Sequence, residues 1–311
     1  MSGNSISQNT AYIKSIARKL GFDYCGISKA EFLKEEAPRL NKWLKNNHHG
    51  QMEYMARHMD KRLDPTKLVD GARSVISLLY NYYPESKLPE DNNFKLARYA
   101  YGKDYHFVLK TKLKEFMSLI RDKIEYAEGR VFVDSAPVLE RQWAARSGLG
   151  WIGKNTLLIH KKAGSYFFIS EILLNVELHN DNPIGDFCGS CNRCIEACPT
   201  SALTPYQMDA RKCLSYLTIE LKENIPEEYN GKLHNWIFGC DICQEVCPWN
   251  KFAKSHKEPD FEPDERLKSM SKKKWIELTN DEYQSLFRES AVKRTKYKGL
   301  KRNINTAIPA S

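Results

Sequence analysis

The 311-residue sequence lacks the patterns that mark membrane and exported proteins. No stretch approaches about 18 consecutive apolar residues, so no membrane span is expected. The first residues, Met1-Ser-Gly-Asn-Ser, show no basic region followed by an apolar run, and this predicts no secretory signal. We therefore expect a protein that makes no contact with a membrane.

Several cofactor and nucleotide motifs are also missing from the sequence. Without a G-x-G-x-x-G at a strand–helix junction, there is no dinucleotide fingerprint, and without a Walker loop there is no indication of ATP-driven chemistry. The C-x3-C-x2-C spacing is absent too, which argues against radical chemistry on a single open cluster. If the protein is a redox enzyme, its electron acceptor must be of another kind.

Cysteine, in contrast, is both present and ordered. Seven of the nine cysteines fall into two runs that each end in Cys-Pro. The first run, Cys188 to Cys198, has the C-x2-C-x2-C-x3-C-P spacing of bacterial ferredoxins. The second, Cys240 to Cys247, is the latter part of the same pattern, and Cys213 is the nearest candidate for its leading cysteine. The spacing predicts two [4Fe–4S] clusters.

In two-cluster ferredoxins the last cysteine of each run ligates the other cluster. The expected ligand sets are Cys188, Cys191, Cys194 with Cys247, and Cys213, Cys240, Cys243 with Cys198.

Zinc and disulfides are the alternative interpretations of these cysteines. Zinc ribbons use two C-x2-C pairs, which leaves both Cys-Pro endings unexplained, and disulfides require an exported chain. Cluster thiolates survive best in a reducing compartment, so we expect a cytoplasmic protein.

Apolar periodicity predicts an α+β protein in three parts. Residues 1–182 are expected to form an α/β-type domain with a mixed sheet, residues 183–250 a bacterial-ferredoxin-like two-cluster domain, and residues 251–311 a short helical, basic C-terminal region. Residues 214–239 form an insert of mostly helical pattern in the second part. In the first part we expect helices over 9–20, 31–60, 105–124 and 138–147, and strands over 22–27, 74–83, 131–134, 156–159 and 166–174.

The formal net charge is +9, and part of it is concentrated in residues 291–302. This segment has six basic residues, no acid and an interleaved Tyr297, a composition that suits contact with a phosphate backbone. A solvated helix face or a frayed tail would explain it as well.

A cluster domain joined to about 180 further residues favours an enzyme over a non-enzymatic ferredoxin-like electron carrier, which stays the alternative from another class. Beyond the cysteines, the order and spacing of several motifs from about residue 10 to 250 resemble those of the epoxyqueuosine reductases. These motifs are Arg98 with Gly102-Lys-Asp-Tyr-His106, Val133-Asp-Ser135 with Glu140-Arg141, Gly148-x-Gly150-x3-Lys154-Asn155, Cys198-Pro-Thr-x-Ala-Leu203, Arg211-x-Cys213-x-Ser215, and Gly239-Cys-Asp241-x-Cys243.

The resemblance implies a cobalamin-dependent enzyme that reduces epoxyqueuosine to queuosine at the wobble position of tRNA. It implies that Asp134 is the proton donor. It further implies that cobalamin binds without a protein histidine on cobalt, which fits the absence of D-x-H-x-x-G here. Residues at positions expected to line the cobalamin are Arg62, Arg98, Asp134, Lys154, Ser215 and Asp241. Either arginine could instead form a surface ion pair. A corrinoid reductive dehalogenase, from a related family, is the second alternative.

The expected partners are a tRNA carrying epoxyqueuosine and an external electron donor, and we expect a monomer. Longer members of the family continue into C-terminal helical repeats, whereas this sequence ends at Ser311. The basic segment is therefore our candidate for contact with tRNA, through Lys293, Arg294, Lys296 and Arg302. The insert suggests that the second cluster lies beside the cobalamin, with Asp134 on the far side of that cofactor.

Overall fold

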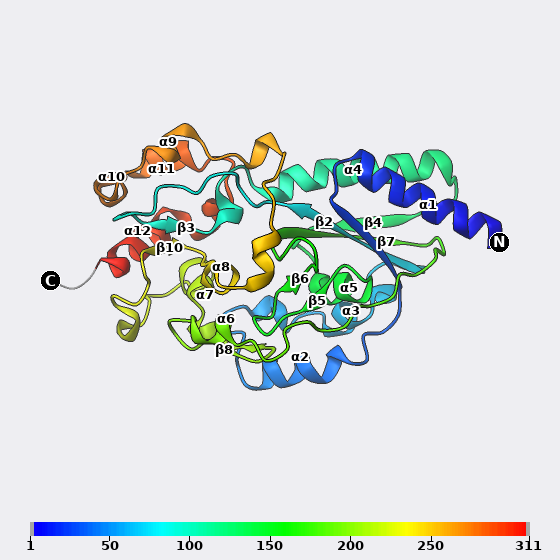
Figure 1. Ribbon diagram of the computed structural model, residues 1–311, viewed down its shortest axis with the longest axis horizontal. Helices are drawn as coiled ribbons and strands as arrows, with labels where there is room; N and C mark the ends of the chain where they lie inside the picture. Colours follow the sequence, from blue (N-terminus) through cyan, green and yellow to red (C-terminus); the bar gives the residue numbers. More distant parts are fainter. Residues whose placement is uncertain (1–2, 309–311) are drawn as a thin grey trace.

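The computed structural model describes residues 3–308. Residues 1–2 and 309–311, the outer limits of the first and third predicted domains, lie outside the described residues. Along the long axis the molecule has two halves (Figure 1). One is built on a four-stranded sheet and contains α1 (Gly3–Lys19), and the other contains α12 (Lys296–Ala307) at the opposite end.

The sheet has the strand order β1-β2-β7-β4, with β1 (Tyr24–Lys29), β2 (Ser74–Asn81), β7 (Phe167–Leu174) and β4 (Gly129–Phe132). Every residue of β2 except the last is buried. Its apolar run is uninterrupted because both faces of this central strand are covered. The predictions of strands over 74–83 and 166–174 are thereby confirmed.

The α+β class is confirmed, but the expectation of a mixed sheet in the first half is wrong. All three pairings of the four strands are antiparallel. β2 and β4 do run in the same direction and are connected through α4 (Tyr105–Lys123), as in a βαβ unit. However, β7 lies between them in the opposite direction. The alternation of strands and helices along the chain could not reveal this insertion, because it depends on a strand that comes later.

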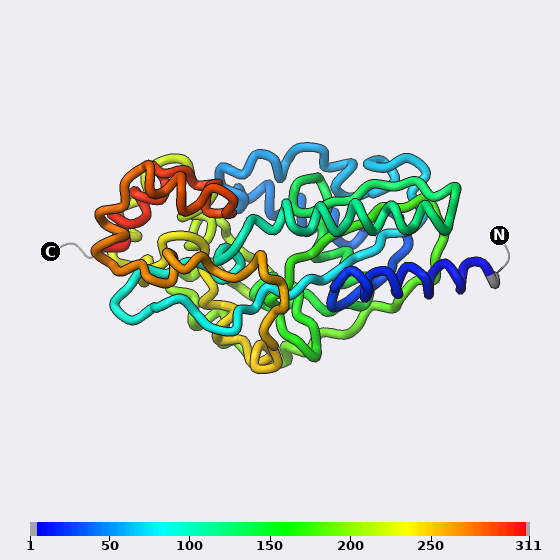
Figure 2. Tube along the Cα trace, turned by 90° about the horizontal axis from the view of Figure 1, so that it is seen from above, coloured from blue at the N-terminus to red at the C-terminus, as the bar shows by residue number. Residues whose placement is uncertain are grey.

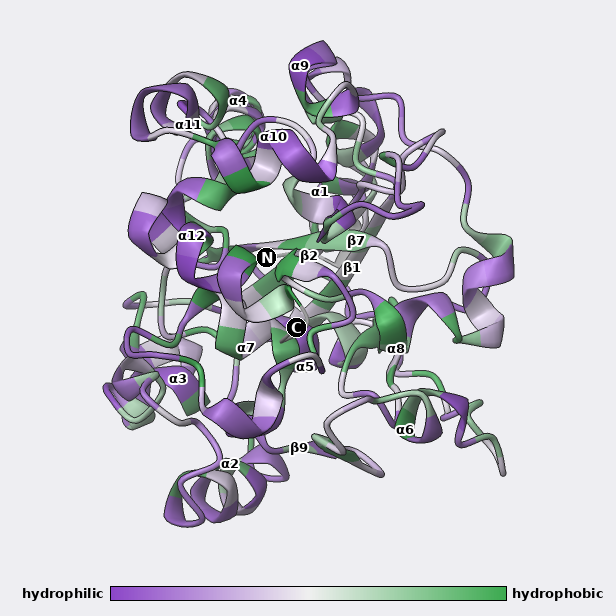
Figure 3. Ribbon diagram, turned by 90° about the vertical axis from the view of Figure 1, so that its left-hand side faces the viewer, coloured by the Kyte–Doolittle hydropathy of each residue, from purple (hydrophilic) through white to green (hydrophobic). Residues whose placement is uncertain are grey.

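Helices cover both faces of the sheet. On one face, α1 and α4 lie side by side (Figures 1 and 2), and their apolar residues form one core with the sheet. On the other face lie α2 (Glu36–Lys45), α3 (Met59–Leu63) and α5 (Glu140–Arg146). The helix expected over 31–60 is wrong in its second half, because Asn47 and Gly50 take positive φ and end it. Figure 3 shows the hydrophobic strands between more polar helices.

The second half is organised around a separate hydrophobic core. β3 (Lys95–Leu96) pairs in parallel with β10 (Trp236–Phe238), and α7 (Leu214–Ile219) and α12 pack against β10. This core takes residues from 88–101, 210–238 and 267–307, and so from all three predicted domains. The division at 182 and 250 stays a prediction. The insert is not mostly helical, because besides α7 it contains only a short turn and β10.

The remaining elements are short. Two hairpins are β5 (Trp151–Ile152) with β6 (Leu158–Ile159), and β8 (Leu203–Thr204) with β9 (Gln207–Met208). The remaining helices are α6 (Arg193–Glu196), α8 (Ile242–Glu245), α9 (Glu265–Lys268), α10 (Lys272–Glu277) and α11 (Asn280–Leu286). The 3₁₀ turns are η1 (Glu53–Met55), η2 (Pro65–Lys67), η3 (Arg98–Ala100), η4 (Ala210–Lys212), η5 (Glu227–Tyr229), η6 (Pro248–Phe252), η7 (Pro259–Phe261) and η8 (Ala291–Thr295). Within residues 3–308, no helix has the length and apolar character needed to cross a lipid bilayer.

Candidate active site

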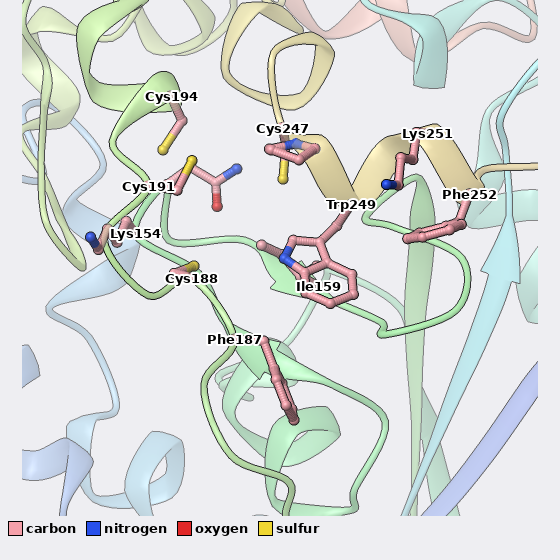
Figure 4. A pocket seen from close by; sticks show the side chains of 12 residues that line it. Lys154, Ile159, Phe187, Cys188, Cys191, Cys194, Cys247, Trp249, Lys251 and Phe252 are labelled. Carbon is pink, nitrogen blue, oxygen red and sulfur yellow. The ribbon is translucent and has the colours of Figure 1, made fainter.

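Four cysteines from two distant segments meet at one cavity of about 310 Å³. Cys188, Cys191 and Cys194 approach it from the first run and Cys247 from the second (Figure 4). The sulfur of Cys188 accepts a hydrogen bond from Trp151 Nε1 at 3.4 Å. Backbone N–H groups also donate to the sulfurs of Cys188 and Cys247. Hydrogen bonds to sulfur are a means by which proteins tune the reduction potential of an iron–sulfur cluster.

The other four cysteines are electrostatic neighbours of one another. Cys198 acts on the thiols of both Cys213 and Cys240, and burial raises the pKa of these two thiols. The first N–H groups of α7, from Ser215 and Tyr216, donate to the Cys213 sulfur. Ser215, a predicted cobalamin residue, is therefore placed at the second cysteine group. In the described part of the chain, no three Cys, His, Asp or Glu side chains are grouped closely enough to hold a single metal ion.

Asp134 lies two residues beyond β4, with its side chain exposed. Its φ is +45°, a left-handed conformation that non-glycine residues rarely adopt. Two contacts hold it. Tyr105 Oη, from the first turn of α4, donates to Asp134 Oδ2 at 2.6 Å, and the Asp134 N–H donates to Glu140 Oε1 at 2.6 Å. Burial and the nearby Asp134 charge raise the pKa of Tyr105 well above its usual value, so Tyr105 keeps its proton and remains a donor.

Two further acids lie close to this turn, Glu140, which is partly buried, and Glu171, which is buried. Burial and the charge of Asp134 raise the pKa of Glu140. Glu171, in β7, is 0% exposed and accepts hydrogen bonds from Ser77 Oγ at 2.8 and 3.0 Å. Burial and the charge of Glu140 raise the pKa of Glu171 well above its usual value. Two acids with raised pKa values therefore follow one another inward from the exposed carboxylate of Asp134, first Glu140 and then Glu171.

Charged side chains from four segments lie near Tyr54, which is 45% exposed. Burial raises the pKa of this phenol to about 12, and the charges of Glu220, Arg294, Asp134 and Arg62 all act on it. The Arg62 guanidinium is buried; its Nη2 donates to the Tyr54 carbonyl at 2.7 Å, and its Nε has no hydrogen-bond partner among the described residues. The fold thus brings the predicted proton donor, one predicted cobalamin residue and one residue of the basic segment to the same place.

Arg98 and Asp241 form an ion pair in the interior. Arg98 Nη1 lies 3.1 Å from Asp241 Oδ2, the Arg98 N–H donates to the same oxygen at 2.8 Å, and Nη2 contacts Glu245 at 2.5 Å. With both side chains buried, the alternative of a surface ion pair is wrong for Arg98. Lys154 lies elsewhere, because its Nζ donates to the Gly189 carbonyl at 2.8 Å in the first cysteine run.

The basic segment is docked, so the frayed-tail alternative is wrong. Leu300 and Ile304 of α12 are buried in the second core. Arg294 forms a bidentate contact with Glu220 at 2.7 and 3.0 Å, and Arg302 donates to the carbonyl groups of Leu217 and Leu221 at the end of α7. Lys293 and Lys296 are exposed and have no ion pair within residues 3–308.

Sequence reasoning gave no role to Tyr54, Tyr105 or Glu140. Tyr105 and Glu140 lie in motifs on which the resemblance to the family was based. A search of those motifs for side chains able to hydrogen-bond to Asp134 could have identified them. Tyr54 has no such signal, because its neighbours come from segments far apart in the chain.

Family models and relatives agree on one assignment. Residues 62–135 match the model "Epoxyqueuosine reductase QueG, DUF1730", and residues 187–250 match the "4Fe-4S double cluster binding domain". An epoxyqueuosine reductase from Leadbetterella byssophila is 59% identical over 94% of this chain and 96% of its own length. One from Escherichia coli is 39% identical over 97% of this chain and 81% of its own length.

The chain belongs to the epoxyqueuosine reductase family.

Family membership confirms the resemblance drawn from the motifs, and the members are oxidoreductases by name. A crystal structure of an epoxyqueuosine reductase with an epoxyqueuosine-modified tRNA-Tyr stem loop matches 96% of this chain and 80% of its own, with 30% identity and a TM-score of 0.88. A structure from Bacillus subtilis is 28% identical with a TM-score of 0.87, over 96% of this chain and 81% of its own. A reductive dehalogenase at 16% identity and a TM-score of 0.52 shares the fold alone, over 96% of this chain and 38% of its own.

Proposed function

We propose that this protein reduces epoxyqueuosine in tRNA to queuosine. The observation that carries the proposal is the family relationship, which extends along nearly the whole chain at 59% identity. A neighbour of the same fold was crystallised with an epoxyqueuosine-modified stem loop, and this supports the same class of substrate here.

Two [4Fe–4S] clusters are assigned to the cysteines. The first would be held by Cys188, Cys191, Cys194 and Cys247, which surround one cavity. The second would be held by Cys198, Cys213, Cys240 and Cys243, which interact electrostatically. Backbone N–H groups that point at several of these sulfurs suit such clusters.

Cobalamin is the second cofactor that the proposal requires. The buried Nε of Arg62, without a partner among the described residues, provides a donor of the kind that amide side chains of a corrin accept. Arg62 and Asp134 would border the cofactor near Tyr54, with Ser215 and Asp241 on the side of the second cysteine group. Arg98 would act by holding Asp241, while Lys154 lies at the first group. When bound, the reduced cofactor supplies the electrons that open the strained epoxide.

The chain itself supplies the proton. Removal of the epoxide oxygen as water takes two electrons and two protons. Asp134 would deliver a proton to that oxygen, because its carboxyl group is exposed and fixed by Tyr105 and Glu140. The Bacillus subtilis neighbour is described with an Asp134 catalytic loop swung out of its active site, which supports a catalytic aspartate in this part of the fold.

The remaining assignments follow from the same proposal. The protein would work in the cytoplasm as a monomer and take electrons from an external donor. Residues 1–182 would bind cobalamin and substrate, residues 183–250 would hold the clusters, and residues 251–311 would form the basic C-terminal region. Lys293 and Lys296 would contact tRNA phosphates, whereas Arg294 and Arg302 also hold α7 in place.

The test is conversion of epoxyqueuosine-containing tRNA by the purified protein, reconstituted with iron, sulfide and cobalamin under anaerobic conditions. Queuosine should form with dithionite as reductant and should not form when cobalamin is omitted. A protein with both clusters and cobalamin bound that leaves the modified nucleoside unchanged would overturn the proposal.

A further inference from the structure

An aromatic cluster extends from the first cysteine group to the protein surface. Trp151 is 3% exposed and contacts Cys188 through its indole nitrogen. Its ring packs against Phe187 and Trp249, with centroid distances of 5.3 and 5.0 Å. Phe252 lies 6.1 Å from Trp249. Phe187 and Phe252 are 40% and 41% exposed, so this cluster ends in two large apolar side chains that face solvent.

Lysine side chains cover the exposed rings. Lys161 Nζ lies 4.2 Å from the centroid of the Phe187 ring, and Lys251 Nζ lies 4.9 Å from that of Phe252. Both lysines are exposed, and neither forms an ion pair within the described residues. The cavity next to them is lined by Lys154 and Lys251 and by no acidic residue.

One acid lies close to this surface, and its hydrogen bonds are already made. Asp186 accepts from the N–H of Cys188, in its own loop, and from Tyr206 Oη, in the turn between β8 and β9. The face formed by Phe187, Trp249, Phe252, Lys161 and Lys251 is apolar at its centre and carries at its rim two lysines that have no ion pair among the described residues. We call it the aromatic–lysine face.

The position of this face suits entry of electrons from outside the protein. The first cysteine group lines an open cavity beside it (Figure 4), whereas Cys213 and Cys240 of the second group pack against the second hydrophobic core. A donor protein could therefore approach the first group far more closely than the second. Small interfaces with a few exposed aromatic side chains and complementary charge are typical of transient redox partners.

We propose that the aromatic–lysine face docks an acidic protein that carries single electrons. The inference rests on the proposed function, because it requires that the first cysteine group hold a redox cluster. In each encounter the carrier is oxidised by one electron and the oxidised cluster is reduced by one, with no bond formed or broken. Two encounters supply the two electrons that removal of one epoxide oxygen requires.

The test reverses the charge of the face. The variant carries Lys161→Glu and Lys251→Glu, and the control carries Lys114→Glu and Lys123→Glu, two exposed lysines of α4 that make the same change in net charge. Photoreduced flavodoxin, an acidic one-electron carrier, is mixed anaerobically with each protein, and cluster bleaching is followed by stopped-flow absorbance. Iron and sulfide content are determined first.

For the face variant we expect a second-order rate constant about 10-fold lower than wild type at low salt, with the difference shrinking as salt screens the charges. The control should reduce at the wild-type rate. Reduction by dithionite and affinity for tRNA should be unchanged in both variants. If the charge-reversed variant loads iron poorly, the same measurements with Lys161→Gln and Lys251→Gln serve in its place, with a smaller expected decrease.

Equal rates for the face variant and the control would overturn the proposal. A loss of tRNA affinity with an unchanged rate of reduction by flavodoxin would also overturn it and would identify the face as an RNA surface. Failure of the proposed function gives a different result, namely wild-type protein that flavodoxin reduces normally but that does not convert epoxyqueuosine with dithionite.

Discussion

Asp134 occupies a backbone conformation that costs free energy, and its neighbours stabilise that conformation. A non-glycine residue with φ near +45° is unfavourable by about 1–3 kcal/mol. The hydrogen bond from its N–H to Glu140 and the contact from Tyr105 offset this cost. The turn therefore fixes where the carboxyl group points, which is a requirement for proton transfer to a bound substrate.

Replacement of Asp134 by asparagine should nearly abolish turnover. The amide keeps the size of the side chain and can still accept from Tyr105, but it cannot deliver a proton. We expect a decrease in turnover of about 10²- to 10⁴-fold, with cluster content and cobalamin binding at wild-type levels by absorbance. Full activity of Asp134→Asn would rule out the role as proton donor.

Glu171 should make stability depend on pH. Burial raises its pKa above the ordinary 4.5, so the folded state binds this proton more strongly than the unfolded state does. The stabilising contribution is complete below pH 4.5 and is lost as pH rises toward the folded-state pKa. Glu171→Gln removes this dependence and should raise the melting temperature by about a few degrees at pH 8, with little change near pH 5.

Thermal unfolding of both proteins between pH 5 and 9 measures this effect. The conservative control is Glu177→Gln, at an acid that is about 59% exposed. Parallel melting curves for wild type and Glu171→Gln across that range would show that Glu171 makes no such contribution.

The basic segment contains two kinds of residue, arginines that bind α7 or the residue that follows it, and lysines that remain exposed. Arg302 binds the last carbonyl groups of α7, where a cation also favours the helix dipole, and Arg294 is paired with Glu220. Lys293 and Lys296 remain exposed. The two arginines therefore stabilise the fold, and the two lysines are available to a phosphate backbone.

Neutralising Lys293 and Lys296 together should weaken tRNA binding and reduce its salt dependence. Each lost phosphate contact lowers the slope of log affinity against log salt by about 1. Binding curves at several salt concentrations measure the slope for Lys293→Gln/Lys296→Gln, and the melting temperature should not change. Arg302→Gln, as comparison, should lower the melting temperature. Unchanged affinity of the double variant at low salt would remove these lysines from the interface.

Local patterns predicted the long strands of the first half, because an apolar run such as residues 74–81 indicates a buried strand even when the neighbouring strands are unknown. The second half was harder. β3 is two residues long and pairs with a strand in the insert, so nothing near Lys95 indicates it. The two cysteine groups were predicted from the spacing of the cysteines. The proposed role of Asp134 came from the resemblance to the family. The charges around Tyr54 could not be predicted, because they meet only in the folded chain.

At the scale of the whole molecule, the first cysteine run has no core of its own. No residue from 183 to 201 is buried, although the segment lies between two well-packed halves. We therefore expect its order to depend largely on what the cysteines bind. A segment that buries little apolar surface gains stability from a bound cofactor much as small metal domains do.

Removal of the clusters should therefore loosen this segment while the sheet stays folded. After oxidation and chelation of iron, limited proteolysis should cut within residues 183–201 faster by about 10-fold or more, since cleavage follows the population of open states. Fragments from β2 and β7 should remain protected, and mass spectrometry locates the cuts. An identical pattern before and after chelation would show that the segment is ordered without clusters.

The pairing of β3 with β10 has a consequence for synthesis on the ribosome. Lys95 and Leu96 leave the ribosome long before Trp236 and Phe238, the residues with which they pair. At a translation rate of about 5–20 residues per second, the segment around β3 waits roughly 7 to 28 s for its partner. Meanwhile the four-stranded sheet can form completely once β7 has been made, but Phe94 and Leu96 stay without the core that buries them in the finished protein. A nascent chain halted before residue 236 should therefore attract chaperones that bind exposed apolar segments.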